Sequence, residues 1–191
     1  TVEHLLTHTA GGWPNDETDP MGRQHALDHA GLIAWTLKTR PLDHPPGTVF
    51  AYSNFGYCVL GRVIEKVMGT TYEKALTELV LEPLGLTSTW FFPNDIMTRR
   101  FAVGHTRHED GTVTVARPWA LPRSATPAGG LSANARDQLA WARFHLGDGT
   151  AADGTRVLSE ESLKAMQQPT ADMRGSALGD AVGMSWLLAE I

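Results

Sequence analysis

Apolar positions along the chain fall mostly at helical spacing. The clearest pattern begins after Asn54, where apolar residues recur every three or four positions up to Val67. Ser53 or Asn54 can cap the start of this helix, and Gly69 can end it. The same spacing predicts five further helices, over residues 2–8, 24–38, 71–81, 135–146 and 159–168. The chain is therefore expected to be rich in helix.

Two segments depart from helical spacing and predict strands. Residues 101–118 hold two β-prone runs on either side of Glu109-Asp110-Gly111, which is typical of a hairpin. Residues 182–188 alternate and predict one strand with an apolar face. That face consists of Val182, Met184, Trp186 and Leu188. Nothing after Ile191 can pair with this strand, so we expect a homodimer or a companion chain at the 182–188 edge.

Composition narrows the classes of function. The 191 residues are 42% hydrophobic and 19% charged, which suits one globular domain or slightly more. The net charge of −5 offers no basic face for nucleic acid, and no apolar run approaches the roughly 18 residues of a membrane span. Cys58 is the single cysteine, so it forms no intrachain disulfide and is expected to be buried. The chain starts without Met or a signal-like stretch, which is typical of a piece of a longer protein and leaves the compartment open.

The most informative short segment is Tyr52-Ser53-Asn54, between a Pro-Pro-Gly turn and the strongest helix. In extended backbone, residues two apart point the same way, so Tyr52 and Asn54 would face one site. A phenol transfers protons near neutral pH only when a neighbouring cation lowers its pKa. In the alternative interpretation, Tyr52 packs in the core and Asn54 only caps the helix. The triplet alone leaves both possibilities open.

Four segments, in order, carry a resemblance to a known family. They are residues 5–12 (LLTHTAGG), 52–57 (YSNFGY) leading to Leu60-Gly61, 82–86 (EPLGL), and 127–131 (PAGGL) with Ala135-Arg136-Asp137. This series resembles the class C branch of the serine β-lactamase and penicillin-binding-protein-like hydrolases, and it covers nearly the whole chain.

The resemblance implies an α+β fold with an antiparallel sheet domain, a helical domain and the active site between them. We expect residues 1–191 to form a partial domain of this transpeptidase-like fold: its helix-rich central portion, mostly the helical subdomain, with a small β-hairpin and an incomplete antiparallel sheet. Residues 182–191 would begin a strand of the sheet domain.

The resemblance also implies roles for two residues, because Tyr52 and Asn54 match the second of the family's three active-site motifs. Tyr52 would relay a proton between an upstream serine, the leaving group and water, aided by an upstream lysine. Asn54 would orient that lysine and the carbonyl side of the substrate. The reaction would acylate the serine with an ester or amide, such as a β-lactam, a D-amino-acid peptide or a simple ester. No metal or organic cofactor is implied.

The first and third family motifs are missing from the chain. The first, Ser-x-x-Lys, has no match before Tyr52, and the hydroxyl–lysine pair Thr71 and Lys74 follows it in an ordinary amphipathic helix. Residues 29–31 (HAG) match the third motif by letters but lie in a predicted helix. Ser53 lacks the flanking glycines of a hydrolase nucleophile elbow, so a capping or core-facing hydroxyl is the better interpretation. We therefore expect the isolated chain to be inactive.

A further candidate region for substrate contact is the loop predicted over residues 13–23. In the resembling enzymes this loop borders the acyl-binding pocket, so Trp13, Asn15 and Asp16 could contact substrate. Trp13 could instead simply cover the end of a helix.

Two histidine pairs have a spacing that can bind metal: His4 with His8, and His25 with His29. Neither has the glutamate that a zincin places after its first histidine, so we expect no metal site. His8 and the threonines beside it are expected to organise the loop that enters Gly11-Gly12.

Two other classes of function remain as alternatives. The protein could be a catalytically silent binding module that keeps the scaffold, and an upstream Ser-x-x-Lys would argue against this. It could also be a helical interaction domain, for which a concentration-dependent mass is the test.

Overall fold

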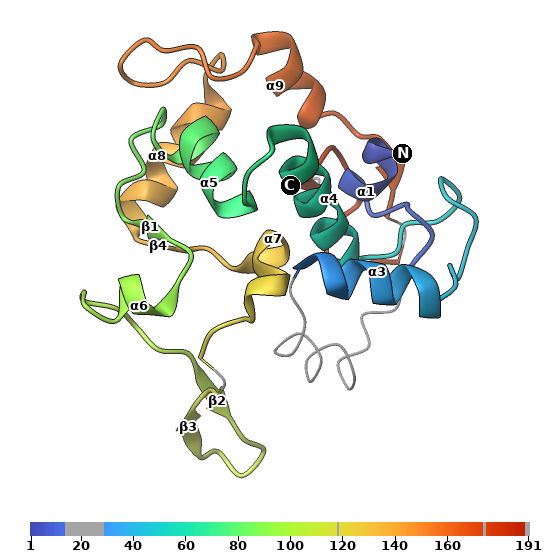
Figure 1. Ribbon diagram of the computed structural model, residues 1–191, viewed down its shortest axis with the longest axis horizontal. Helices are drawn as coiled ribbons and strands as arrows, with labels where there is room; N and C mark the ends of the chain where they lie inside the picture. The colour runs from blue at the N-terminus through green and yellow to red at the C-terminus, as the bar shows by residue number, and fades with distance from the viewer. Residues whose placement is uncertain (14–28, 118, 174, 190–191) are drawn as a thin grey trace.

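The computed structural model of the chain describes residues 1–13, 29–117, 119–173 and 175–189. Helices dominate it, and the strands form small antiparallel sheets (Figure 1). The α-helices are α1 (Val2–Leu6), α3 (His29–Thr39), α4 (Asn54–Met68), α5 (Tyr72–Leu76), α6 (Pro93–Ile96), α7 (Thr126–Gly129), α8 (Ala135–Leu146) and α9 (Glu160–Met166). None of these helices is long and apolar enough to cross a membrane.

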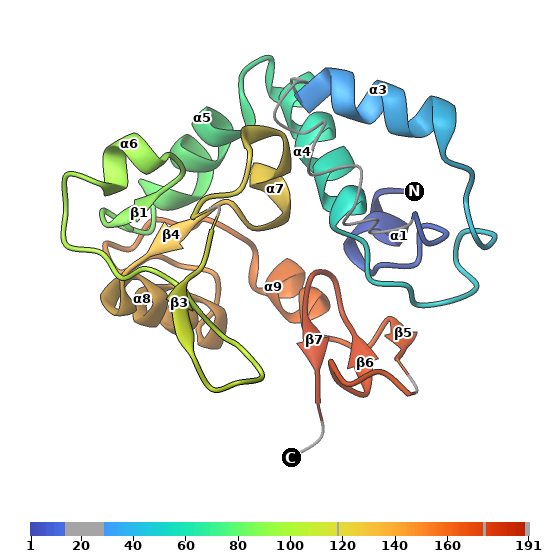
Figure 2. The same ribbon diagram turned by 90° about the horizontal axis from the view of Figure 1, so that it is seen from below.

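Helix α4 is the centre of the part of the fold that carries the candidate site. Its start is capped by Ser53, whose hydroxyl accepts a hydrogen bond from the Gly56 N–H at 3.1 Å. Its end is set by Gly69, which adopts a left-handed conformation with φ 64°. Both ends agree with the prediction, and Cys58 is buried as expected. Helices α1, α3, α5 and α7 all pack against α4 (Figures 1 and 2).

The other predicted helices exist, and all but α8 have changed boundaries. Helix α1 ends at Leu6, because His8 has a left-handed backbone with φ 54° that cannot continue it. The described part of the 24–38 prediction is α3, while residues 24–28 lie outside the described residues. The 71–81 prediction becomes α5 followed by a π-helix over Thr77–Leu81. Helix α8 has the predicted bounds, and α9 is a shorter form of the 159–168 helix.

The predicted hairpin is present. Strands β2 (His105–Arg107) and β3 (Val113–Val115) pair in antiparallel register, and Gly111 supplies a left-handed residue with φ 84° in the turn. A second pair, β1 (Thr89–Trp90) with β4 (Ser132–Ala133), was not predicted. Each of its strands has two residues, which is too short for any hydrophobic period to show.

The single strand predicted over residues 182–188 is wrong. The segment forms two short strands, β6 (Ala181–Val182) and β7 (Leu187–Leu188), which pair with each other. The chain reverses between them at Ser185, which has φ 66°. Strand β5 (Ala171–Asp172) pairs with the other side of β6, so Val182 is fully buried. A period of two over seven residues does not distinguish one strand from a tight hairpin, and the expected dimer or companion chain cannot rest on an unpaired strand here.

Candidate active site

The backbone before α4 separates Tyr52 and Asn54 from Ser53. Ser53 has an extended conformation, with φ −138° and ψ 108°, and its side chain is buried. Tyr52 is 43% exposed, and Asn54, the first residue of α4, is also exposed. The alternation predicted from the sequence is therefore present, with the two candidate catalytic residues outside and the capping serine inside. Ser53 is engaged as a helix cap, as expected.

His8 forms the support beneath Tyr52. The two rings stack with centroids 4.4 Å apart and planes at 27°. Tyr57 also lies close to the imidazole, at 4.8 Å and 30°, and Phe50 meets it edge-on at 5.8 Å. His8 is only 6% exposed. Its ring is therefore held among three aromatic side chains.

The His8 imidazole also binds the backbone beside Tyr52. Its Nδ1 accepts a hydrogen bond from the Ser53 N–H at 3.0 Å, so the ring proton of the neutral form is on Nε2. Burial lowers the pKa of His8 to about 4. The imidazole is therefore neutral near pH 7 and keeps the Nδ1 lone pair that this bond requires.

The loop after α1 is joined to the segment that leads to Tyr52 by backbone hydrogen bonds. The Ala51 N–H donates to the His8 carbonyl at 2.8 Å, and the Gly47 N–H donates to the Thr9 carbonyl at 2.7 Å. The hydroxyls of Thr7 and Thr9 lie 2.9 Å apart in the buried part of the same loop. The prediction that His8 and its threonines organise this loop is confirmed.

Gly11 allows the two segments to approach. Its φ is 108°, and its carbonyl accepts hydrogen bonds from the Asp43 and His44 N–H groups at 2.8 and 3.1 Å. A Cβ at this position would lie 2.5 Å from the His44 carbonyl oxygen. Only glycine meets both requirements, which explains this part of the LLTHTAGG segment.

Tyr57 is a site-supporting residue that the sequence analysis missed. Its hydroxyl donates to the Leu6 carbonyl at 3.0 Å and lies 3.0 Å from the Ser185 hydroxyl. Burial raises the pKa of Tyr57, although the hydrogen bond with Ser185 opposes the shift. The phenol therefore stays protonated and links α1, α4 and the β6–β7 turn. The one signal in the sequence for this role is the position of Tyr57 near the start of the helix that follows Tyr52.

Of the three predicted substrate-binding residues, the structure describes only Trp13. Trp13 is half-buried, and its ring meets Phe55 in the first turn of α4 at 5.3 Å and 74°. This contact agrees with a tryptophan that covers the helix start. Asn15 and Asp16 lie outside the described residues.

Neither histidine pair forms a metal site that the structure can show. His8 uses Nδ1 for the Ser53 N–H, and His25 lies outside the described residues. Within the described part of the chain, no group of three or more His, Cys, Asp or Glu side chains is placed to hold a metal ion. Residues 29–31, which match the third motif by letters, lie in α3 as expected.

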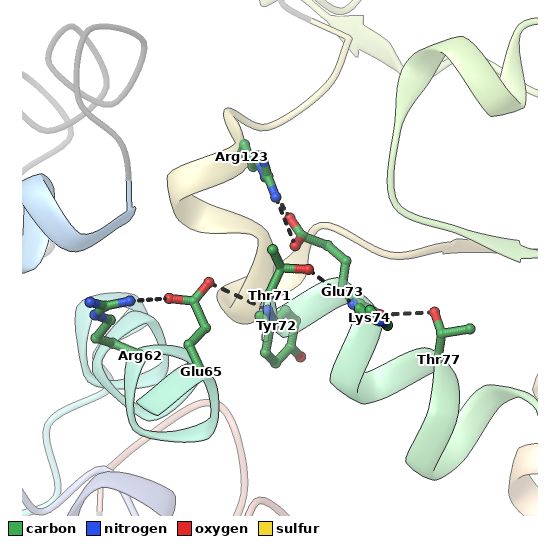
Figure 3. Close-up of polar contacts among 8 residues, drawn as sticks. All are labelled: Arg62, Glu65, Thr71, Tyr72, Glu73, Lys74, Thr77 and Arg123. Carbon is green, nitrogen blue, oxygen red and sulfur yellow. Dashed lines mark hydrogen bonds and ion pairs between the residues drawn. The ribbon is translucent and has the colours of Figure 1, made fainter. Parts of the chain in front are cut away.

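The hydroxyl–lysine pair at Thr71 and Lys74 is a helix cap. The Thr71 hydroxyl accepts from the Lys74 backbone N–H at 3.3 Å (Figure 3). The Lys74 ammonium lies 3.7 Å from the carboxylate of Glu78. The spacing that resembles a nucleophile motif therefore belongs to the N-terminus of α5.

A groove of about 860 Å³ lies beside α5 and the π-helix, and neither Tyr52 nor Asn54 lines it. Glu73 and Arg123 lie in its wall, joined by two hydrogen bonds of 2.8 and 3.2 Å (Figure 3). Burial raises the pKa of the Glu73 carboxyl, but the bonds and charge of Arg123 outweigh this, and the pKa lies below its usual range. The sequence analysis did not predict this pair, whose partners are 50 residues apart.

Two curated proteins are similar to the chain over most of its length. Penicillin-binding protein 4 of Amycolatopsis lactamdurans is 37% identical over 172 residues, which cover 90% of this chain and 44% of that protein. Protein Rv1367c of Mycobacterium tuberculosis (strain ATCC 25618 / H37Rv) is 35% identical over 175 residues, which cover 87% of this chain and 43% of that protein. The chain thus spans less than half the length of these curated relatives.

Solved structures share the fold. The octameric penicillin-binding protein homologue from Pyrococcus abyssi superimposes with a TM-score of 0.78 at 25% identity, over 97% of this chain and 42% of that one. The D-amino acid amidase from Ochrobactrum anthropi SV3, complexed with D-phenylalanine, gives a TM-score of 0.75 at 23% identity, over 96% of this chain and 53% of that one. The helix-rich α+β fold with small antiparallel sheets is therefore that of the penicillin-binding proteins. The family model described as Beta-lactamase matches residues 1–190, and the chain belongs to this family of serine hydrolases.

Proposed function

We propose that the complete protein containing this chain is a serine hydrolase that works through an acyl-enzyme on an ester or amide. The observation that carries the proposal is the arrangement of Tyr52 and Asn54, exposed on either side of the buried Ser53 at the start of α4. This arrangement offers a phenol and an amide to one site, which is what the second family motif requires.

The chain supplies one wall of the proposed site. The nucleophilic serine and its lysine lie upstream of Thr1, and the third motif lies after residue 191. Tyr52 takes the proton from the serine as it attacks the carbonyl and passes it to the leaving group. It then accepts a proton from the water that deacylates the enzyme and returns that proton to the serine oxygen. Asn54 holds the lysine and the carbonyl side of the substrate by hydrogen bonds.

The loop around Trp13, with Asn15 and Asp16, borders the acyl group in this proposal. The contact between Trp13 and Phe55 supports it, because it places the indole beside the residue that follows Asn54. Residues 1–191 contribute mostly the helical subdomain. The substrate class is a β-lactam, a D-amino-acid peptide or a simple ester.

The test uses full-length protein with a chromogenic cephalosporin, a D-amino-acid anilide and a nitrophenyl ester. Tyr52→Phe keeps the ring that stacks on His8 and removes only the hydroxyl, so turnover should fall about a hundredfold to ten-thousandfold. The melting temperature should not change. Tyr72→Phe, the same substitution in α5, is the matched control and should keep the wild-type rate.

Two outcomes would contradict the proposal. Wild-type turnover in Tyr52→Phe would remove this residue from the chemistry. A full-length protein that has no Ser-x-x-Lys, and that shows no acyl adduct by mass spectrometry with any of the three substrates, would instead be the silent binding module.

A further inference from the structure

His8 contacts three consecutive residues of the segment that carries Tyr52. Its carbonyl accepts from the Ala51 N–H at 2.8 Å, its Nδ1 accepts from the Ser53 N–H at 3.0 Å, and its ring stacks on Tyr52 itself. The backbone on both sides of Tyr52 and the plane of its ring are therefore set by one residue, which lies 45 positions from Ser53 in sequence.

His8 is itself firmly held. Its backbone is in the left-handed region, at φ 54°, and the next residue, Thr9, donates its N–H to the His4 carbonyl at 2.8 Å. The Tyr57 ring lies 4.8 Å from the imidazole, and the Tyr57 hydroxyl is tied to the Leu6 carbonyl. A left-handed conformation at a residue other than glycine is unfavourable and persists only where the surrounding contacts impose it.

The need for such a support follows from the exposure of Tyr52. A tyrosine that is 43% exposed has room to rotate about its side-chain bonds, and rotation moves the hydroxyl by far more than the ring centre. A displacement of about 1 Å at a reacting group can cost roughly a hundredfold in rate. The stacked imidazole restricts this rotation on one face of the ring.

We propose that His8 is a positioning residue, which holds the Tyr52 hydroxyl in place through the stacked ring and the two flanking backbone bonds. This inference rests on the proposed function of Tyr52. His8 neither donates nor accepts the transferred proton, because its Nδ1 is engaged by the Ser53 N–H and the residue is buried.

The test uses full-length protein with substitutions that separate the two kinds of side-chain contact. His8→Phe keeps an aromatic ring and loses the acceptor, whereas His8→Asn keeps a short acceptor, tolerates the left-handed backbone and loses the stack. Each should lower kcat by about tenfold to a hundredfold and change KM less than threefold. His105→Phe, at an exposed position of β2, is the matched control and should keep both constants.

A second background distinguishes positioning from general damage. In Tyr52→Phe protein the hydroxyl is already gone, so adding His8→Phe or His8→Asn should cause no further loss of kcat. Further loss of the same size would overturn the inference, and so would wild-type kcat in both single variants. Wild-type activity of Tyr52→Phe alone would instead overturn the proposed function.

A spectroscopic measurement, which does not depend on turnover, distinguishes displacement of the Tyr52 ring from general unfolding of the variants. In protein labelled with 3-fluorotyrosine, the Tyr52 signal, assigned by its loss in Tyr52→Phe, should carry the ring-current shift of the stacked imidazole. His8→Asn should move it toward the unfolded position while leaving the Tyr72 signal in place. An unmoved Tyr52 signal would contradict the support by His8, and movement of both signals would show general unfolding and overturn the specific role.

Discussion

The guanidinium of Arg123 makes two hydrogen bonds to the carboxylate of Glu73, and the carboxylate is buried while the arginine side chain is 62% exposed. The pair connects α5 to the 3-10 helix over Arg123–Ala125 at the wall of the groove. Loss of the arginine would leave a buried charge without its strongest partner.

Arg123→Gln should therefore lower the free energy of unfolding at pH 7 by about 1–2 kcal/mol. This is less than the 3–5 kcal/mol of a fully buried pair, because water reaches the arginine. Lys74→Gln, which breaks an ion pair between exposed side chains, should cost less than about 0.5 kcal/mol and serves as the control. Urea unfolding of both variants measures the difference.

The same variant should respond differently to acid. In the wild type the pKa of Glu73 is lowered, so its stabilising contribution is present above the unfolded pKa and is lost as pH falls through the folded pKa. Without Arg123, two of the causes that lower the pKa of Glu73 are gone while burial still raises it, so this pKa is higher than in the wild type. The difference in free energy of unfolding between wild type and Arg123→Gln should therefore shrink as the pH falls from 7 to 3. A difference that stays constant over this range would show that the pair does not contribute.

His8 should make stability fall in mild acid. Burial lowers its pKa from 6.5 to about 4, so the folded state binds a proton less readily than the unfolded state. The contribution of neutral His8 to the free energy of unfolding is fully present above pH 6.5. It is lost as the pH falls toward 4, by up to about 3 kcal/mol. Urea unfolding at several pH values should show a shallower decline for His8→Asn. An identical decline would assign the effect to other groups.

His145 is buried among the rings of Trp141, Phe144 and Trp186, and neither ring nitrogen has a hydrogen-bond partner among the described residues. Unsatisfied buried polar atoms destabilise a fold, and an apolar group of similar shape removes that cost. His145→Phe should therefore raise the free energy of unfolding by about 1 kcal/mol. A loss of more than 1 kcal/mol would indicate that the imidazole has a partner outside the described residues.

Gly11→Ala should destabilise the protein by more than 2 kcal/mol, since the added Cβ combines an unfavourable φ with a contact of 2.5 Å to the His44 carbonyl. Gly69→Ala is the control. It has the same kind of φ but nothing within 4 Å of the new Cβ, so it should cost only about 1 kcal/mol. Equal costs at the two positions would show that the close approach at Gly11 relaxes freely.

The isolated chain of 191 residues should hydrolyse neither a chromogenic cephalosporin nor a nitrophenyl ester. Electrostatic stabilisation of the transition state has no effect without an attacking group, and Ser53 is buried as the cap of α4. Turnover that persists through repurification, and that disappears in Ser53→Ala, would make Ser53 the nucleophile.

Local features could be predicted from the sequence. The run from Ser53 to Gly69 contains a cap, a helical period and a stop, so α4 was predicted with its ends. The extended backbone before it was enough to predict the alternation, in which Tyr52 and Asn54 are exposed and Ser53 is buried. These features depend on a few neighbouring residues, and the sequence shows those neighbours directly.

Contacts between distant segments could not be predicted. Nothing near Glu73 indicates Arg123, and nothing near Tyr57 indicates Ser185, which is 128 residues away. The π-helix that follows α5 could not be predicted either, since its sequence keeps an ordinary helical period. The candidate site was therefore predicted as a pair of exposed residues, without the histidine and tyrosine that support them.

Synthesis from the N-terminus delays the contact of Tyr57 with Ser185. A ribosome adds about 5–20 residues per second, so Ser185 follows Tyr57, 128 residues earlier, by roughly 6 to 25 seconds. During that interval the Leu6 carbonyl lacks the bond from the Ser185 N–H as well. The nascent chain must therefore carry an unfinished support for Tyr52 during this interval, a period in which chaperones can still bind it.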